Sequence, residues 1–208
     1  MSEMRARVLA AAVEVVRAVG VQRATTKAIA EAAGVSEGSI FNHFPTKAAL
    51  LKAVFTEGID NPMPAAMARL WSDTGLGDVT TSLTALAVAA VRYYREVLPL
   101  SGPQVRGAEE IRNARATVEE PEFGPIIGHD GLTRYLSVEQ GLGRIPADAD
   151  PALLAVALLG GCQQYAFLCL TTAPSRLQDP RSGLTADPTT FAERLINLLI
   201  PRSTAPGE

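Results

Sequence analysis

A cluster of small polar side chains near the start of the chain has the chemistry to contact the base edges of DNA. Its members are Ser36, Glu37, Gly38, Ser39, Asn42 and His43. Hydroxyl, carboxyl, amide and imidazole groups can donate to, or accept from, the edges that bases present in the major groove. Gly38 adds no side chain and would let a helix approach the duplex closely. The cluster therefore predicts one face of a recognition helix.

A second set of residues is suited to phosphate. Lys47 is expected in the first turn of a helix, where its ammonium and the neighbouring backbone N–H groups could hold a phosphate together. Thr25, Thr26 and Lys27 are placed to do the same at the start of an earlier helix.

Local signals supply the helices that must position these groups. Thr25 can cap a helix that ends at Gly34, and Ser36 can cap the next one, which carries Ile40, Phe41 and Phe44 toward Pro45. Two short helices joined by a tight turn are the layout of a helix-turn-helix DNA reader. By periodicity alone the same caps and glycines would serve any small three-helix unit.

The remainder of the chain also has the helical period, and no segment alternates with the period of two that a strand needs. The fold is therefore expected to be all-α. Helices are predicted over residues 8–19, 63–71, 78–100, 104–118, 121–142, 151–172 and 188–200, with a polar loop over 174–186. Asp150-Pro151 and Asp187-Pro188 each pair a capping aspartate with a proline at the first helical position, which is a strong helix start.

Charge divides the chain into two parts. The 208 residues are 47% hydrophobic and carry a net charge of −3, which excludes a disordered chain and a protein that is basic throughout. Residues 1–56 nevertheless have a net charge of +3, and the rest has −6. We predict a helix-turn-helix domain over residues 1–56 and a separate all-helical domain over residues 57–208. A basic head on an acidic body suits a protein that meets phosphate with one end.

Catalytic and metal chemistry have little support. Cys162 and Cys169 lie on one predicted helix, without the spacing of a zinc site or a disulfide framework. His43 and His129 are the only histidines, and no phosphate-binding glycine loop or nucleophile elbow is present. We expect no enzyme, no metal and no cofactor.

One segment is long enough to span a membrane. Residues 152–173 contain no charged side chain, but Gln163, Gln164, Thr171 and Thr172 lie inside it. A helix packed on both its own domain and a partner has the same composition, and we favour that interpretation and a cytoplasmic protein.

The run from Thr25 to Leu50 closely resembles the signature of the TetR family of bacterial transcriptional regulators. The matching positions are Thr25, Ile29, Ala30, Ala33, Gly34, Val35, Ser36, Gly38, Ser39, Ile40, Phe41, Phe44, Pro45, Thr46, Lys47 and Leu50. The resemblance covers the first quarter of the chain. It implies a DNA-binding head over residues 1–56 and, over residues 57–208, an all-helical ligand-binding and dimerisation domain that binds a small-molecule effector and forms a homodimer.

Two positions depart from the family pattern. Glu37 stands where a basic residue is common, and it either accepts from a cytosine amino group or is a solvated acid favoured by the helix dipole. Phe41 stands where an aromatic residue usually carries a hydroxyl, so it either packs or contacts a sugar or a thymine methyl. His43 either donates to DNA or is an ordinary surface imidazole.

The resemblance also implies roles in the body. The last two long helices would form a four-helix bundle with those of a second subunit, through Gly160, Gly161, Phe191, Leu195, Leu198 and Leu199. The alternative is that both helices build the core of a single subunit. Candidates to line an effector pocket are Trp71, Tyr93, Tyr94, Tyr135, Gln163, Gln164 and Phe167.

These expectations combine into a homodimeric regulator, most simply a repressor, that a small apolar or aromatic effector releases from a double-stranded operator. Two alternatives stay open. One is a structural DNA-binding protein without effector control, and the other is a small-molecule-binding protein or enzyme with a vestigial head.

Overall fold

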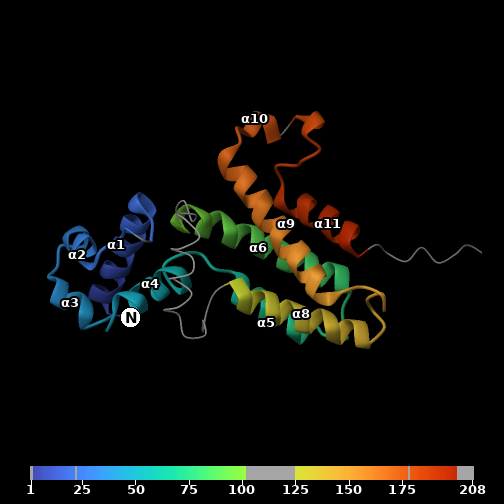
Figure 1. Ribbon diagram of the computed structural model, residues 1–208, viewed down its shortest axis with the longest axis horizontal. Helices are drawn as coiled ribbons and strands as arrows, with labels where there is room; N and C mark the ends of the chain where they lie inside the picture. Colours follow the sequence, from blue (N-terminus) through green and yellow to red (C-terminus); the bar gives the residue numbers. More distant parts are fainter. Residues whose placement is uncertain (1, 22, 102–124, 178, 201–208) are drawn as a thin grey trace, which may run out of the picture. The chain divides into compact units, whose positions relative to one another are not determined.

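A computed structural model describes residues 2–21, 23–101, 125–177 and 179–200. Within these ranges all regular structure is helical (Figure 1). In chain order the elements are α1 (Glu3–Val19), α2 (Thr26–Ala33), α3 (Glu37–Phe41), α4 (Lys47–Thr56), α5 (Met63–Ser72), α6 (Val79–Ser101), α8 (Pro125–Gly141), α9 (Pro151–Thr171), α10 (Pro174–Leu177), the 3₁₀ turn η1 (Pro180–Ser182) and α11 (Pro188–Leu199). The predicted helix over 104–118 lies outside the described residues.

The chain divides into two compact units. The first contains Met1–Asn61 and the end of α6 from Glu96, and the second contains Pro62–Arg95 and the described residues from 125 onward. The predicted domain boundary after residue 56 stays a prediction.

The first unit is held together by one face of α1. Val8, Ala12 and Val16 recur every four residues, so they share a side of the helix, and all three are fully buried. This face packs against α2 and α4. Gly20, with φ 79°, ends α1 as the sequence predicts.

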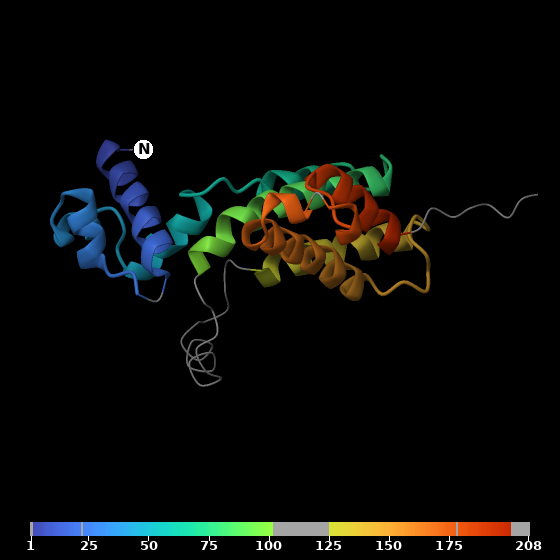
Figure 2. The ribbon, with the colours of Figure 1, turned by 90° about the horizontal axis from the view of Figure 1, so that it is seen from above.

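The second unit has a single apolar core. Its helices pack side by side, with α8 against α9 and α5, and α9 against α11 (Figures 1 and 2). The side chains that fill the centre include Leu83, Leu86, Leu132, Leu136, Leu158, Cys162 and Ile196. Asp150 and Asp187 cap α9 and α11 through their side chains, as the sequence predicts.

A buried carboxylate fixes the turn between α5 and α6. Glu139 of α8 has no exposed surface, and its Oε1 accepts from the backbone N–H of Gly75 at 2.9 Å. Arg144 lies with Nε 3.1 Å from Glu139 Oε2 and donates to the carbonyl of Gly77. The buried charge is therefore paired, which a carboxylate in a core requires.

Two local features differ from expectation. The predicted polar loop over 174–186 contains α10 and η1, because Leu177 packs inward and the Tyr165 hydroxyl donates to the carbonyl of Thr185 at 2.9 Å. The helix α3 ends at Phe41, so Phe44 lies on the turn that follows it. Phe44 precedes Pro45, and a residue before proline is disfavoured in the helical region.

Candidate nucleic-acid interface

The helix-turn-helix is built by caps at each of its ends. Thr25 Oγ1 accepts from the N–H of Ala28 at 3.1 Å, and Ser36 Oγ accepts from the N–H of Ser39 at 3.2 Å. Gly34, with φ 64°, adopts the left-handed conformation that turns the chain between α2 and α3. Ile40 and Phe44 are buried and hold α3 on the head.

The candidate DNA-contacting residues all reach the surface of the head. Seven of them are exposed: Thr25, Lys27, Ser36, Glu37, Gly38, Phe41 and Asn42. The remaining four are partly exposed: Thr26, Ser39, His43 and Lys47. The structure thus separates a buried side of α3 from a side that is available to a partner. The contacts of these residues with DNA remain predictions.

Phe41 is the unusual member of this surface. The residue is 43% exposed although it lies on the recognition helix of a well-packed head. An exposed aromatic ring beside polar groups is suited to a thymine methyl or a sugar, which offer apolar contact in the groove.

Several hydroxyls of the surface are already engaged with one another. Thr26 Oγ1 donates to Glu37 Oε1, which joins the start of α2 to the start of α3. The hydroxyls of Ser36 and Ser39 lie 2.7 Å apart and share a hydrogen bond. These hydrogen bonds therefore hold part of the exposed surface of α2 and α3 in a fixed arrangement before any DNA is present.

A residue that the sequence analysis did not select ties the head together. Arg5 of α1 donates through both Nη atoms to Glu57, at 2.6 and 2.8 Å, and its guanidinium lies 4.8 Å from the centre of the Phe44 ring. The pair lowers the pKa of the Glu57 carboxyl, chiefly through the hydrogen bonds from Arg5. Arg5 and Glu57 are 52 residues apart in the sequence, so no local pattern indicated this contact.

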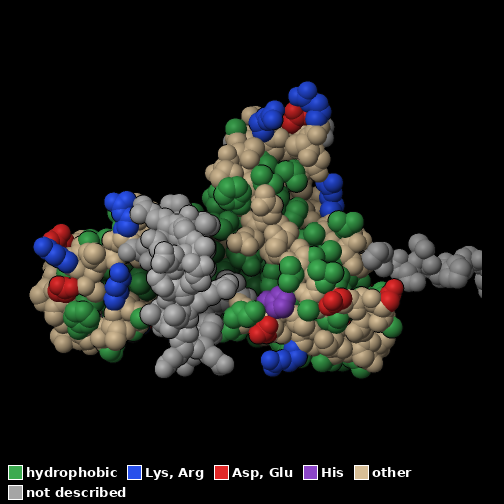
Figure 3. Space-filling model, in the orientation of Figure 1, with side chains coloured by type: hydrophobic (Ala, Val, Ile, Leu, Met, Phe, Trp, Pro, Cys, Tyr) green, Lys and Arg blue, Asp and Glu red, His purple; other side chains and the backbone are tan. Residues whose placement is uncertain are grey.

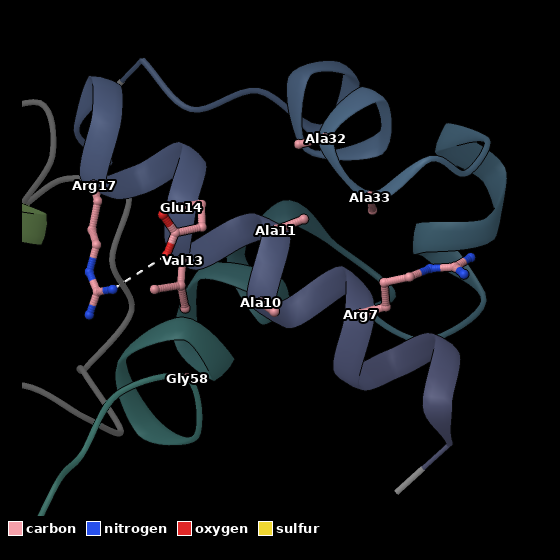
Figure 4. A pocket seen from close by; sticks show the side chains of 9 residues that line it. All are labelled: Arg7, Ala10, Ala11, Val13, Glu14, Arg17, Ala32, Ala33 and Gly58. Atoms are coloured by element: carbon pink, nitrogen blue, oxygen red, sulfur yellow. Dashed lines mark hydrogen bonds and ion pairs between the residues drawn. The ribbon is translucent and has the colours of Figure 1, made fainter.

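An open groove of about 460 Å³ lies on another part of the head (Figure 4). Ala10 and Ala11 of α1 and Ala32 and Ala33 of α2 form much of its wall. At one end Arg17 pairs with Glu14 at 3.4 Å and with Glu96 of α6 at 3.1 Å. The lining includes none of the candidate DNA-contacting residues.

Residues 8–54 match the sequence model of bacterial regulatory proteins of the tetR family. The head belongs to the TetR family. The matched residues extend from α1 to α4 and include the whole helix-turn-helix. The resemblance predicted from the run between Thr25 and Leu50 is therefore confirmed.

Solved structures share the fold over almost the whole length of this chain. The fatty acid degradation regulator FadR from Bacillus halodurans is 18% identical, covers 99% of both chains and has a TM-score of 0.64. FadR from Bacillus subtilis, solved in complex with stearoyl-CoA, is 18% identical over 94% of this chain and 97% of its own, with a TM-score of 0.61.

A third structure is NalD, the secondary repressor of the MexAB-OprM multidrug efflux pump in Pseudomonas aeruginosa. It is 23% identical, covers 96% of this chain and 97% of its own, and has a TM-score of 0.62. At these identities the likeness establishes the fold, and the predicted all-α architecture of head and helical body is confirmed. A search of curated protein sequences gave no match.

In the body of the protein, α9 has a long, largely apolar face that is exposed in the single chain. Apolar side chains spread over α9 and α11 on the face shown in Figure 3. Exposed residues of α9 recur at intervals of three or four positions, at Leu153, Val156, Gly160, Gln163, Phe167 and Leu170, with Gln164 beside Gln163. This spacing places them along one side of the helix. Leu153, Val156 and Leu170 were not selected from the sequence, although their spacing could have indicated them.

The candidate interface residues divide into two groups. Gly160 is exposed, and Leu198 of α11 is 75% exposed. Gly161 and Leu195 instead pack on each other within the chain, since a Cβ on Gly161 would lie 3.1 Å from Leu195 Cδ2. Phe191 stacks on Tyr165 with ring centres 4.0 Å apart, and Leu199 packs against the core.

The candidate effector-binding residues also divide. Trp71 meets the buried Tyr135 edge to face at 6.0 Å, and Tyr93 and Tyr94 form a tilted pair at 5.6 Å. Burial raises the pKa of Tyr94 to about 12, which reflects how little water reaches its hydroxyl. The other three candidates, Gln163, Gln164 and Phe167, lie on the exposed side of α9.

An open hollow of about 300 Å³ lies between α5 and α6. Its lining includes Ala65, Arg69 and Leu70 of α5 and Ser82 and Ala85 of α6. None of the candidate effector-binding residues is part of it.

Proposed function

We propose that the protein is a homodimeric transcriptional repressor that binds an operator through α3 and is released by a small apolar or aromatic effector. One observation carries the DNA-binding part of this proposal. The polar side chains of a TetR-family recognition helix all reach the surface, while Ile40 and Phe44 anchor that helix to the head.

The exposed side of α9 supports the homodimer. Fully burying one leucine or valine side chain contributes about 1.5–3 kcal/mol, so an apolar stripe along a whole helix is costly to leave in water. A second copy that presents the same stripe would cover it with two-fold symmetry. Leu153, Val156 and Phe167 of α9 and Leu198 of α11 would supply the apolar centre of that interface.

In this proposal the exposed side of α9 contacts a second subunit and not a membrane. Residues Pro151–Thr171 are long and apolar enough to span a bilayer, and only 33% of the apolar window is buried within the chain. A soluble regulator with a helix-turn-helix head needs a protein partner for that face. The exposed Gln163 and Gln164 suit a subunit interface, where two copies could hydrogen-bond.

The effector site is proposed among the aromatic residues of α5, α6 and α8. Trp71, Tyr93 and Tyr94 keep some exposed surface, and Tyr135 forms the buried wall beside Trp71. Aromatic walls with a few hydroxyls favour an apolar ligand with few polar groups. Two similar folds suggest ligands to test, because one was solved with stearoyl-CoA and another is the secondary repressor of a multidrug efflux pump.

A gel shift on the DNA upstream of the protein's own gene tests the proposal. We expect a shifted complex at physiological salt. The two-fold symmetry of the proposed homodimer predicts a near-palindromic site, with half-sites about 34–36 Å apart or somewhat more. A panel of long-chain acyl-CoA thioesters and small aromatic compounds is then added. The expected result is loss of the complex with one chemical class, because the ligand prefers a state that does not fit the operator.

The rival functions give different outcomes in the same assay. A structural DNA-binding protein would shift unrelated DNA equally well and respond to no ligand. A ligand-binding protein or enzyme with a vestigial head would bind a compound and shift no DNA. A complex that a ligand strengthens would identify an activator or a corepressed regulator.

A further inference from the structure

We infer that Glu37 reads an amino-bearing base, with cytosine favoured, and that Thr26 is the residue that positions it. The inference deepens the proposed operator binding and rests on it. It starts from the hydrogen bond that joins the two helices of the reader, in which Thr26 Oγ1 donates to Glu37 Oε1.

The location of Glu37 places it among the groups that would face a base. It is the first residue of α3 and is exposed, next to the bare backbone of Gly38. Phe41 lies four residues later and therefore on the same side of the helix. An acid at this place is close to phosphates in any bound complex, so a compensating contact is needed for tight binding.

The hydrogen bond from Thr26 restricts where the carboxylate can be. A free glutamate side chain samples many rotamers and loses that freedom when it binds. Here one oxygen is held by a residue on the neighbouring helix, and Oε2 remains to accept a further hydrogen bond. Part of the conformational entropy that the Glu37 side chain would lose on binding DNA is therefore already lost in the free protein.

The chemistry of the carboxylate selects the base. An ionised carboxylate only accepts hydrogen bonds. In the major groove the guanine edge offers the acceptors O6 and N7, which repel it, whereas cytosine offers the N4 amino group as a donor. Adenine offers N6 but places the acceptor N7 beside it. Glu37 therefore favours cytosine at one position of each half-site.

The same geometry changes the role expected of Thr26. A hydroxyl has one proton, and that of Thr26 is directed to Glu37, so it cannot also be donated to a phosphate. Thr26 is then a positioning residue, and its contribution should be specific to one base pair. A phosphate contact would instead affect every DNA sequence alike.

Selection from a randomised library of DNA duplexes tests the inference with four proteins: the wild type, Glu37→Gln, Thr26→Val and Thr26→Ser. We expect the wild type to prefer cytosine at one half-site position by roughly tenfold or more. Glu37→Gln should shift that preference toward adenine, with which an amide can pair. Thr26→Val should weaken the preference at that position alone, and Thr26→Ser should retain it.

A change in the DNA provides a second readout that leaves the protein intact. Replacing that cytosine by N4-methylcytosine removes the N–H that faces the major groove. The wild type should lose roughly tenfold in affinity, and Glu37→Ala should not distinguish the two duplexes. Equal loss in both proteins would show that the methyl group acts only by bulk and would overturn the inference.

The selection also separates the possible failures. If the wild type enriches no sequence, the proposed operator binding fails together with this inference. If it enriches an operator and Glu37→Gln only tightens binding to every sequence, Glu37 is merely a repelling charge. If Thr26→Val weakens binding to all sequences alike and leaves the salt slope unchanged, Thr26 is a phosphate contact, because an uncharged hydroxyl displaces no counterion.

Discussion

At Gly38 the recognition helix has no side chain on a side that is open to a partner. A Cβ built there would meet only Ser36 Oγ, at 3.9 Å, and Gly38 does not have a positive φ. Neither the fold nor the packing of the head therefore requires a glycine. The remaining physical reason is close approach of another molecule, which for this helix would be the DNA backbone or a base edge.

Gly38→Ala is accordingly expected to preserve the fold and weaken DNA binding. Alanine inside a helix is more stable than glycine by roughly 0.5–1 kcal/mol, so thermal unfolding should move to a slightly higher temperature. The measurement pairs a melting curve with operator affinity. Unchanged affinity would mean that the helix does not approach DNA closely at this position. Gly34→Ala is the contrasting variant, because the left-handed φ of 64° makes it destabilising.

Lys47 makes a charge-based prediction at the same scale. It is the first residue of α4, which Thr46 caps through the N–H of Ala49 at 3.0 Å. Lys47→Ala should weaken binding to specific and random DNA alike and lower the slope of log K against log salt by about one. Lys52→Ala, on another side of α4, is the matched control. An unchanged slope for Lys47→Ala would remove it from the phosphate contacts.

Among the helices of the head, the pair between α1 and the end of α4 gives a prediction about pH. Arg5→Ala should lower the melting temperature at neutral pH, because it removes the bidentate pair with Glu57 and the contact with Phe44. The pKa of Glu57 is lowered in the folded state, so the pair stabilises above the unfolded pKa near 4.5 and is lost as pH falls through the folded pKa.

The difference between wild type and Arg5→Ala should therefore shrink as the pH falls below the unfolded pKa of Glu57, and also at high salt. Melting curves across pH measure it. Arg23→Ala, on the exposed turn before α2, is the control and should show little effect at any pH. A difference that persists unchanged in acid would assign the effect of Arg5 to its packing on Phe44.

Sequence patterns located most helices because caps and stops act over a few residues. Gly20, Gly34, Asp150 and Asp187 each mark a helix end that the structure reproduces. The short α10 was not predicted, because a four-residue helix depends on tertiary contacts such as the burial of Leu177.

The site could be anticipated only in part for the same reason. The polar face of α3 follows from its own residues. Other features depend on how separate helices pack against each other. They are the hydrogen bond between Thr26 and Glu37, the contact between Gly161 and Leu195, and the burial of Tyr135 beside the partly exposed Tyr93 and Tyr94. The spacing of these residues along the sequence does not specify those contacts between helices.

For the whole molecule, the exposed side of α9 predicts the oligomeric state. Val156→Glu should give a folded monomer, because a charge at the centre of an apolar interface is costly to desolvate. Sedimentation measures the change, and circular dichroism checks that the helices remain. Leu76→Glu is the control, since Leu76 is 82% exposed on the turn between α5 and α6.

Leu198→Glu makes the same test from α11, where the leucine is 75% exposed. Leu195 is a poorer choice for it because that residue packs on Gly161 of its own chain, and a charge there would also disturb the fold. A dimer that survives both Val156→Glu and Leu198→Glu would place the subunit contact elsewhere.

The exposed side of α9 also makes repression depend on the number of protein copies in a cell. In the proposed dimer, each chain contributes one recognition helix, and both are needed for tight operator binding. While most chains are monomers, the concentration of dimer rises with the square of the concentration of chain, by mass action. Doubling the dose of the gene would then raise operator occupancy up to fourfold, so a modest change in expression becomes a sharp change in repression.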